Sequence, residues 1–260
     1  MGNVLMKVKL LSSGSKGNCC LVITNKVKAL IDIGTTSSYV EKALKSINID
    51  PKEITHILIT HDHIDHIKGL KVFANKYKPV IHVTEKLKEH LQKEIGELNY
   101  ESFVDKMCII DDLIVKTIKT SHDATDSVGY ILKNNTSTLV YITDTGYINS
   151  KYYDELSNKN LYILESNHDV KMLREGPYPY YLQQRVIGDK GHLSNNQASN
   201  YLCRFIGKNT KKIVFAHISE HNNTEEKVIE TFNDELKKNN MKFSDIMIAR
   251  QNECTEFIEV

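Results

Sequence analysis

The chain has 260 residues, of which 40% are hydrophobic, so it can bury one substantial core. Lys and Arg number 34 against 33 Asp and Glu, and this net charge of +1 excludes a globally basic nucleic-acid binder but not a local basic groove. The 5 cysteines lack C-x-x-C spacing, and the chain has neither a signal pattern nor an apolar run of the roughly 18 residues that cross a membrane, so we predict a cytoplasmic protein with reduced thiols and no membrane partner.

The N-terminal residues predict a strand followed by a loop of small residues. Residues 4 to 11 partly alternate apolar and polar side chains, as strands do. The loop from Ser12 to Asn18 leaves backbone N–H groups accessible, as in turns that hold anions. Ser13, Ser15 and Asn18 are therefore candidate substrate-binding residues, and an ordinary flexible turn is the alternative.

The next strands lead to a dense group of side chains that can bind metal. Two strands over 20–24 and 27–33 form a hairpin that places Asp32 at a buried strand end. The apolar run 57–59 is typical of a buried strand, and Thr60-His61-Asp62-His63-Ile64-Asp65-His66 follows it directly. Imidazole and carboxylate groups at this density suit Zn- or Mn-class ions, and the two ligand pairs favour two ions over one. A histidine-rich turn without function is the alternative.

Strands and helices alternate along the rest of the chain. We predict helices over 67–77, after Thr84, over 195–205 and over 224–238, and strands over 79–83, within 107–132 and over 138–142, 161–164, 213–216, 245–249 and 255–260. Three strands end at His122, Asp144 and His217, where open sheets place their chemistry. His56, His82 and His90 lie outside these positions and should pack or lie at the surface. The alternation implies an α/β fold with two sheets face to face and helices outside, in one domain over 1–260.

The strand-end motifs resemble those of the metallo-β-lactamase superfamily. The resemblance implies an αββα sandwich of two mixed sheets and two divalent ions per chain, Mn or Zn. By the same resemblance, one ion is held by His61, His63 and His122, the other by Asp65, His66 and His217, and Asp144 bridges them. Two cations within about 4 Å would lower the pKa of a bridging water enough to give hydroxide near neutral pH, with Asp65 also taking part in catalysis. Asp32 would orient the metal-site loop.

Two later segments resemble the nucleases that process tRNA 3′ ends. Glu165 ends a strand within Leu164-Glu165-Ser166-Asn167-His168-Asp169, and His192 precedes a helix start in Gly191-His192-Leu193-Ser194-Asn195-Asn196-Gln197-Ala198. In that branch the glutamate orients the histidine, which protonates the leaving oxygen, so the resemblance implies that Glu165 and His192 take these roles. For His192, a surface histidine at a helix start is the alternative. His168 either contacts substrate or caps the following helix.

Over nearly the whole chain, the motifs resemble the YycJ/WalJ (VicX) family of Gram-positive bacteria. The resemblance rests on Ser-Gly-Ser-x-Gly-Asn, the histidine-rich hexad, Ser-His-Asp-Ala, Glu-Ser-Asn-His-Asp-Val and Gly-His-Leu-Ser-Asn. It implies a 5′ to 3′ exonuclease that prefers double-stranded DNA, with Mn as activating ion and a link to DNA repair. Arg174 and Tyr178, with Arg185 and Lys190 beyond them, could bind phosphates and stack on a terminal base. A packed connection between two helices is the alternative for this segment.

Other hydrolases could use the same metals: an RNA-processing nuclease, a cyclic phosphodiesterase or a thioesterase of the glyoxalase II type. The strand-like residues 245–260 argue against the thioesterase, which adds a helical substrate domain after its core. Only 72 residues separate Asp144 from His217, too few for the domain that β-CASP ribonucleases insert there. A metal-binding regulatory module without turnover is disfavoured, because every ligand position is filled. The residues leave the native metal and the oligomeric state open.

Overall fold

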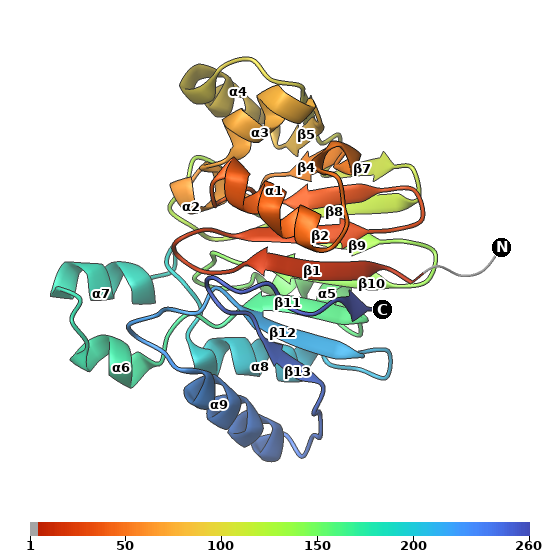
Figure 1. The fold of residues 1–260 in the computed structure, drawn as a ribbon. Coiled ribbons are helices and arrows are strands. Elements are labelled where there is room, and N and C mark those ends of the chain that lie inside the picture. The colour runs from red at the N-terminus through yellow and green to blue at the C-terminus, as the bar shows by residue number, and fades with distance from the viewer. Residues whose placement is uncertain (1–4) are drawn as a thin grey trace.

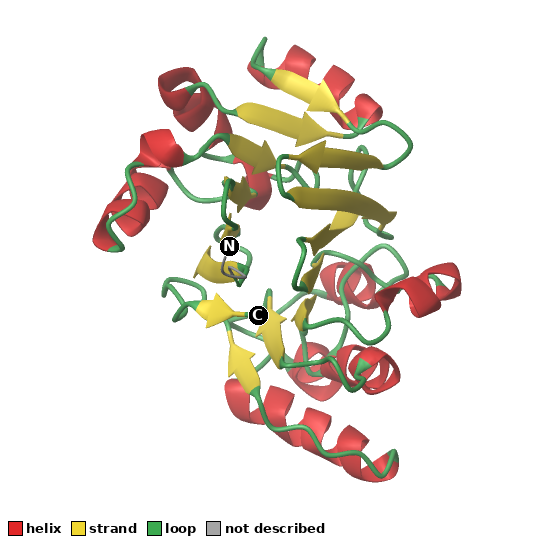
Figure 2. Cartoon of the chain, turned by 90° about the vertical axis from the view of Figure 1, so that its right-hand side faces the viewer, coloured by secondary structure: helices red, strands yellow, loops and turns green. Residues whose placement is uncertain are grey.

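Two sheets of seven strands stack face to face, and helices cover their outer faces (Figures 1 and 2). The computed structural model describes residues 5–260. Both sheets are mixed, since three neighbouring strand pairs in each are antiparallel and three are parallel. The predicted α/β sandwich with two mixed sheets and outer helices is confirmed.

The first sheet contains most of the N-terminal strands. In order across the sheet, its strands are β14 (Ile258–Glu259), β1 (Lys7–Ser12), β2 (Cys19–Ile23), β3 (Lys28–Ile31), β4 (His56–Leu58), β5 (Val80–Val83) and β6 (Tyr100–Ser102). The hairpin of β2 and β3 was predicted, and its register pairs Cys20 with Ile31. The strand predicted over 4–11 begins at Lys7, and Val4 lies outside the described residues.

The second sheet contains most of the later strands. In order across the sheet, they are β13 (Ile246–Ile248), β12 (Lys212–Ala216), β11 (Leu161–Glu165), β10 (Thr138–Ile142), β9 (Val128–Lys133), β8 (Leu113–Lys119) and β7 (Met107–Ile110). β10, β11 and β12 are almost entirely apolar because both of their faces are covered. Their parallel arrangement brings three carboxyl ends to one edge of the sheet.

Three clusters of buried hydrophobic side chains lie between the layers and pack them together. The central cluster lies between the sheets and joins side chains from both, such as Leu10 and Tyr141. The second packs the first sheet against α1 (Ser37–Ser46), α3 (Leu70–Tyr77) and α4 (Glu85–Ile95). The third packs the second sheet against α5 (Tyr153–Leu156), α8 (Asn195–Phe205) and α9 (Glu225–Lys238). The remaining helical segments are the short helices α2 (Ile64–Ile67), α6 (Val170–Glu175) and α7 (Tyr180–Ile187) and the 3₁₀ turns η1 (Pro51–Glu53) and η2 (Ser150–Tyr152).

Some elements differ from the predicted ones. The helix predicted over 67–77 begins earlier, at Ile64, and is interrupted, so that α2 and α3 flank Gly69. A Cβ at Gly69 would lie 2.4 Å from the Thr35 carbonyl oxygen, so the close approach of these two backbones needs glycine. The sequence patterns predicted neither α1 nor β6. The terminal strands are shorter than predicted, because only Ile246–Ile248 and Ile258–Glu259 pair with neighbours.

None of the helices among residues 5–260 is both long enough and apolar enough to cross a membrane. Residues 145–216 supply α5, β11 and α6 to α8, together with β12, and thus form regular parts of the second half of the sandwich. That one domain spans all of residues 1–260 stays a prediction.

Candidate metal and catalytic site

The predicted site residues meet where the carboxyl ends of the parallel strands of both sheets face each other. Asp32 follows β3, His61 follows β4, Asp144 follows β10 and His217 follows β12. Asp32, Asp144 and His217 have φ angles of 61°, 56° and 51°, in the left-handed region that non-glycine residues seldom adopt. Such backbone strain concentrates at functional sites, and here it occurs at three strand ends that carry predicted site residues.

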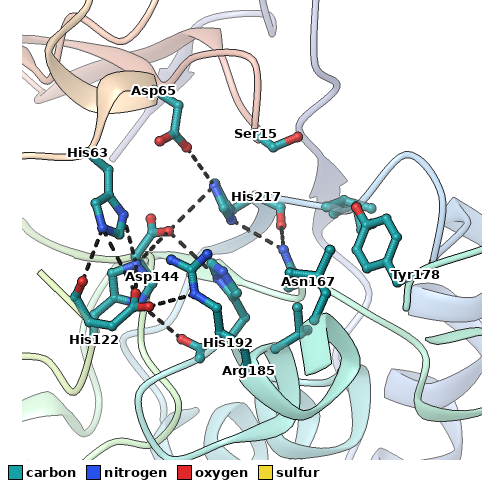
Figure 3. A pocket seen from close by; sticks show the side chains of 16 residues that line it. Ser15, His63, Asp65, His122, Asp144, Asn167, Tyr178, Arg185, His192 and His217 are labelled. Carbon is teal, nitrogen blue, oxygen red and sulfur yellow. Dashed lines mark hydrogen bonds and ion pairs between the residues drawn. The ribbon is translucent and has the colours of Figure 1, made fainter. Parts of the chain in front are cut away.

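Two groups of potential ligands lie side by side. In one, His61, His63 and His122 each offer a nitrogen within 4.8 Å of the others. In the other, a carboxylate oxygen of Asp65 and one nitrogen each of His66 and His217 lie within 4.8 Å of one another. Asp144 lies between the groups: its Oδ1 is 3.8 Å from His122 Nε2 and 3.6 Å from His217 Nε2 (Figure 3). The structure thus brings together all seven residues that the resemblance implies as metal ligands.

Each histidine of the two groups has an orienting partner at one of its ring nitrogens. Thr60 Oγ1 donates to Asp32 Oδ2, so His61 Nδ1 donates to Thr60 Oγ1 at 3.0 Å. His66 Nδ1 donates to Asp32 Oδ2 at 2.7 Å, and His122 Nδ1 donates to the Gly191 carbonyl at 3.1 Å. This is the arrangement that protein metal sites use to fix a histidine tautomer.

The remaining two histidines follow the same rule. His63 Nε2 donates to the Asp123 carbonyl at 3.2 Å, and His217 Nδ1 lies 3.4 Å from Glu165 Oε2. His61 Nε2, His217 Nε2 and Asp144 Oδ2 are buried without a hydrogen-bond partner among the described residues. Buried polar atoms without partners are rare, and these three, which belong to the two ligand groups and to the carboxylate between them, fit divalent cations with nitrogen and oxygen ligands.

Charge in the site follows from the crowding of carboxylates and imidazoles. Burial opposes ionisation of Asp144, but the positive charges of His217 and His66 outweigh burial and hold the pKa of this carboxyl well below its usual range. Burial likewise opposes protonation of His217, yet Asp144, Asp65 and Glu165 together raise its pKa to about 10. Burial dominates at His61 and lowers its pKa well below the ordinary value, so this imidazole is neutral and free to act as a ligand.

Glu165 and His192 form a pair beside the ligand groups. Glu165 Oε2 lies 3.0 Å from His192 Nδ1, and Oε1 accepts from the backbone N–H of Leu193 at 2.8 Å and of Thr145 at 3.1 Å. Burial raises the pKa of Glu165, but the charge and hydrogen bond of His192 outweigh it and lower the pKa to about 2. The carboxylate can only accept, so Nδ1 of His192 carries the proton and Nε2 is left to act on a ligand.

A pocket of about 220 Å³ opens over these groups, and Figure 3 shows the side chains around it. Ser15 and Tyr178, two of the candidate substrate-binding residues, line it. Arg185 lines it too and donates to Asp123 Oδ2 at 2.6 Å. Asn167 was not among the candidates. Its amide donates to the His217 carbonyl at 3.0 Å, and its place two residues after Glu165 at a strand end was the available signal.

The other predicted substrate-binding residues do not line this pocket. Ser13 is buried and its Oγ accepts from the His217 N–H at 2.8 Å. Asn18 is buried, and its amide nitrogen lies 3.0 Å from His66 Nε2. His168 is buried, and Asp169, not His168, caps α6. Arg174 is exposed on α6, outside the pocket lining. Ser13 and Asn18 are thus buried against the candidate ligands His217 and His66, and neither lines the pocket.

Comparison with known proteins places this geometry in a family. Residues 13–155, more than half of the chain, match the model of the metallo-beta-lactamase superfamily. The chain is 34% identical over 232 residues to the exodeoxyribonuclease WalJ of Streptococcus pneumoniae, covering 87% of this chain and 86% of WalJ. The chain belongs to the metallo-β-lactamase superfamily. It is also 36% identical over 221 residues to the exodeoxyribonuclease YycJ of Bacillus anthracis, covering 84% of each protein, so within the superfamily it belongs to the WalJ/YycJ family.

A solved structure supports the fold independently. The metallo-β-lactamase-fold protein YhfI from Bacillus subtilis matches with a TM-score of 0.75, covering 98% of this chain and 100% of YhfI, at 15% sequence identity. Members of the metallo-β-lactamase superfamily bind divalent metals, and the ligand groups around Asp144 fit such ions. The protein is a metal-dependent hydrolase of this superfamily.

Proposed function

We propose that the protein is an exodeoxyribonuclease that removes nucleotides from the 5′ ends of duplex DNA and takes part in DNA repair. The relationship to WalJ and YycJ, both named exodeoxyribonucleases, supports the class of substrate. The observation that carries the proposal is the Glu165–His192 pair beside the ligand groups, because it supplies a proton donor that a poor phosphodiester leaving group needs. The five unpaired cysteines support the prediction of a reducing, cytoplasmic compartment.

We assign the ligand roles as the resemblance implies. His61, His63 and His122 would hold one ion, Asp65, His66 and His217 the other, and Asp144 would contact both. When bound, two Mn²⁺ or Zn²⁺ ions would polarise the phosphodiester and lower the pKa of an attacking water. The rest of the site orients these ligands: Asp32 and Thr60 hold His61 and His66, and Ser13 and Asn167 hold the backbone of His217.

His192 is the proposed general acid. As the bond between phosphorus and the leaving 3′-oxygen breaks, His192 Nε2 would give its proton to that oxygen. Glu165 would hold the ring through Nδ1 and stabilise it while it is positively charged, since this carboxylate is buried and ionised. The mononucleotide then leaves with a 3′-hydroxyl, and the remaining DNA keeps a 5′-phosphate.

The size and lining of the pocket favour a single terminal nucleotide. Its volume of about 220 Å³ offers no groove for a long duplex within the ligand groups themselves. Tyr178, which lines the pocket on the side away from His63, could stack on an unpaired terminal base (Figure 3). Attack at the first internal phosphodiester would place the leaving oxygen near His192 and release one nucleotide for each round.

The direct test is degradation of end-labelled duplexes by purified protein with Mn²⁺. We expect 5′ mononucleotides to appear first from a label at the 5′ end, and closed circular DNA to resist. Rapid cutting of the closed circle, or mononucleotides appearing first from a 3′ label, would contradict the proposal and favour an endonuclease or the opposite polarity.

A further inference from the structure

Next to the catalytic pocket lies a second pocket of about 370 Å³, and we infer that it binds a phosphate group of the DNA substrate. This inference rests on the proposed function. We call it the lysine pocket, after Lys86, Lys119, Lys151 and Lys190, which line it together with Tyr147 and polar residues. It contains no Asp or Glu side chain, although the whole chain has nearly equal numbers of acids and bases.

Charge is the first argument. Lys119 pairs with Asp126, which lies outside the pocket lining, whereas Lys86, Lys151 and Lys190 form no ion pair with any carboxylate in residues 5–260. Burial, and secondarily the charge of Lys86, lower the pKa of Lys119. A different lysine-rich hollow, along α9, is neutralised: Lys227 pairs with Glu230 and Lys237 with Asp234. Because no Asp or Glu lines the lysine pocket, a bound anionic ligand would balance the charge of its lysines.

Position is the second argument. His122 lines both pockets, so the lysine pocket borders the proposed metal ligands directly. Three loops contribute to both. The loop after β8, whose last residue is Lys119, carries His122. The loop after β10 carries Asp144 and leads to Lys151, and the loop after α7 carries Lys190 and His192. A phosphate held by these lysines would therefore be bound by the same loops that hold the reacting groups.

The loops are packed tightly enough to keep this relation fixed. The Gly146 N–H donates to the Ser121 carbonyl at 2.9 Å, and the Ser121 N–H donates to Thr145 Oγ1 at 3.0 Å. A Cβ at Gly146 would lie 2.3 Å from the Asp189 carbonyl oxygen, so the loop after α7 packs directly against the loop after β10 at this glycine. Tyr147, which is 40% exposed at the pocket, offers a ring beside the lysines for a sugar or base.

Lysine binds phosphate as a point charge, so the pocket would accept either the 5′-terminal phosphate of the leaving nucleotide or a backbone phosphate further along the DNA.

The test uses Lys86→Glu together with Lys151→Glu, two residues remote in sequence from His192. The control is Lys208→Glu together with Lys211→Glu, exposed lysines that precede β12 at the opposite end from His217 and change the net charge equally. The pair Lys86→Gln and Lys151→Gln replaces the glutamate variant if its melting temperature falls.

Two measurements separate the outcomes. The first is kcat/KM of the Mn²⁺-loaded protein on duplexes with a 5′-phosphate or a 5′-hydroxyl. The second is binding of the same duplexes, carrying a 3′ fluorescein, to metal-free protein in EDTA at several salt concentrations. We expect the Lys86/Lys151 variant to lose at least tenfold in kcat/KM and in affinity, with a salt slope lower by about one to two, and the control to stay within twofold of wild type.

A loss confined to 5′-phosphorylated DNA would assign the pocket to the terminal phosphate, and an equal loss on both duplexes would assign it to the backbone. If the Lys86/Lys151 variant binds and degrades both duplexes as the control does, the inference is overturned. That result differs from failure of the proposed function, in which the wild-type protein itself would release no nucleotide from either duplex.

Discussion

Ser13 and Ser15 stand two residues apart in the loop after β1, but they face different surroundings. The hydroxyl of Ser13 is buried and accepts from the His217 N–H, whereas Ser15 lines the catalytic pocket. His217 adopts a left-handed φ of 51° at the end of β12, a conformation that needs support from neighbours. Ser13 provides part of that support. A substitution of Ser13 should therefore change metal binding, through the position of His217, and should not change DNA binding directly.

We predict that Ser13→Ala weakens metal binding, by about 10-fold or more, because loss of an orienting partner usually costs 10- to 100-fold in affinity. Ser15→Ala is the matched control, and it should leave metal affinity unchanged while raising KM for DNA. Competition with a fluorescent chelator measures the first quantity, and steady-state kinetics measure the second. Equal metal affinity in both variants would show that Ser13 does not act through His217.

His192 should be needed for turnover but not for metal binding. We predict that His192→Ala keeps its metals and loses about 10²- to 10⁴-fold in kcat on DNA, the range typical of general acid catalysis. An activated ester such as bis-p-nitrophenyl phosphate needs little protonation of its leaving group, so the same variant should lose much less on it. An equal loss on the two substrates would remove the proton-donor role and leave His192 as a positioning residue.

At the scale of elements, β4 and β5 place a histidine pair away from the metal ligands. His56 Nδ1 and His82 Nε2 lie 2.9 Å apart, as side chains of these neighbouring parallel strands. Burial, and then the nearby His56, lower the pKa of His82 to about 4, and burial also lowers the pKa of His56. These histidines are packing residues, as expected from their places outside the motifs.

Stability should therefore fall in mild acid. The folded pKa of His82 lies below the unfolded value of about 6.5, so the unfolded chain binds the proton first. Stability is fully present above pH 6.5 and is lost as the pH falls toward 4, by about 2 kcal/mol at pH 5. We predict that His82→Phe removes this part of the pH dependence in urea unfolding of metal-free protein. His221→Gln, at an exposed site, is the control, and identical pH slopes for all three proteins would contradict the pKa assignment.

At the scale of the whole molecule, carboxylates and imidazoles from both sheets crowd together at the site edge, where few hydrogen bonds, such as that from the His217 N–H to Ser13 Oγ, join the sheets. Asp65, Asp144 and Glu165 lie there among six histidines, and three polar atoms of these side chains have no hydrogen-bond partner within residues 5–260. Asp65 and His66 come from the first half of the sandwich, and Asp144 and His217 from the second. Ions bound between these groups would cross-link the halves.

Metal removal should therefore lower the melting temperature. At free Mn²⁺ or Zn²⁺ about 100-fold above Kd, each bound ion adds about 2.7 kcal/mol, so two ions correspond to about 10 to 20 °C for a domain of this size. We predict two ions per chain by elemental analysis and a shift of this size on chelation. Asp144→Ala should abolish most of the shift, and Asp234→Ala, an exposed acid on α9, should keep it. A wild-type protein that binds no metal would overturn the ligand assignment.

The sequence by itself determined the fold class, the seven candidate ligands and the Glu165–His192 pair. Most of these residues stand at or shortly after the end of an apolar strand, and the carboxyl ends of parallel strands meet at one edge of a sheet. The ligand roles, and the pairing of Glu165 with His192, which precedes a helix, came from the resemblance to known motifs. Boundaries were less predictable: α1 has only a few apolar positions, and the break at Gly69 depends on the backbone of Thr35, which lies far away in sequence.

Only the tertiary structure decided which side chains line the catalytic pocket. Burial separates Ser13, Asn18 and His168 from the pocket and leaves Ser15 in it, although all four belong to equally polar motifs. The lysine pocket joins residues from four separate segments, 86, 119, 151 and 190, none of which forms a charge run in the chain. Burial and electrostatic fields depend on distances across the folded molecule, and these distances arise from the packing of the two sheets and not from spacing along the chain.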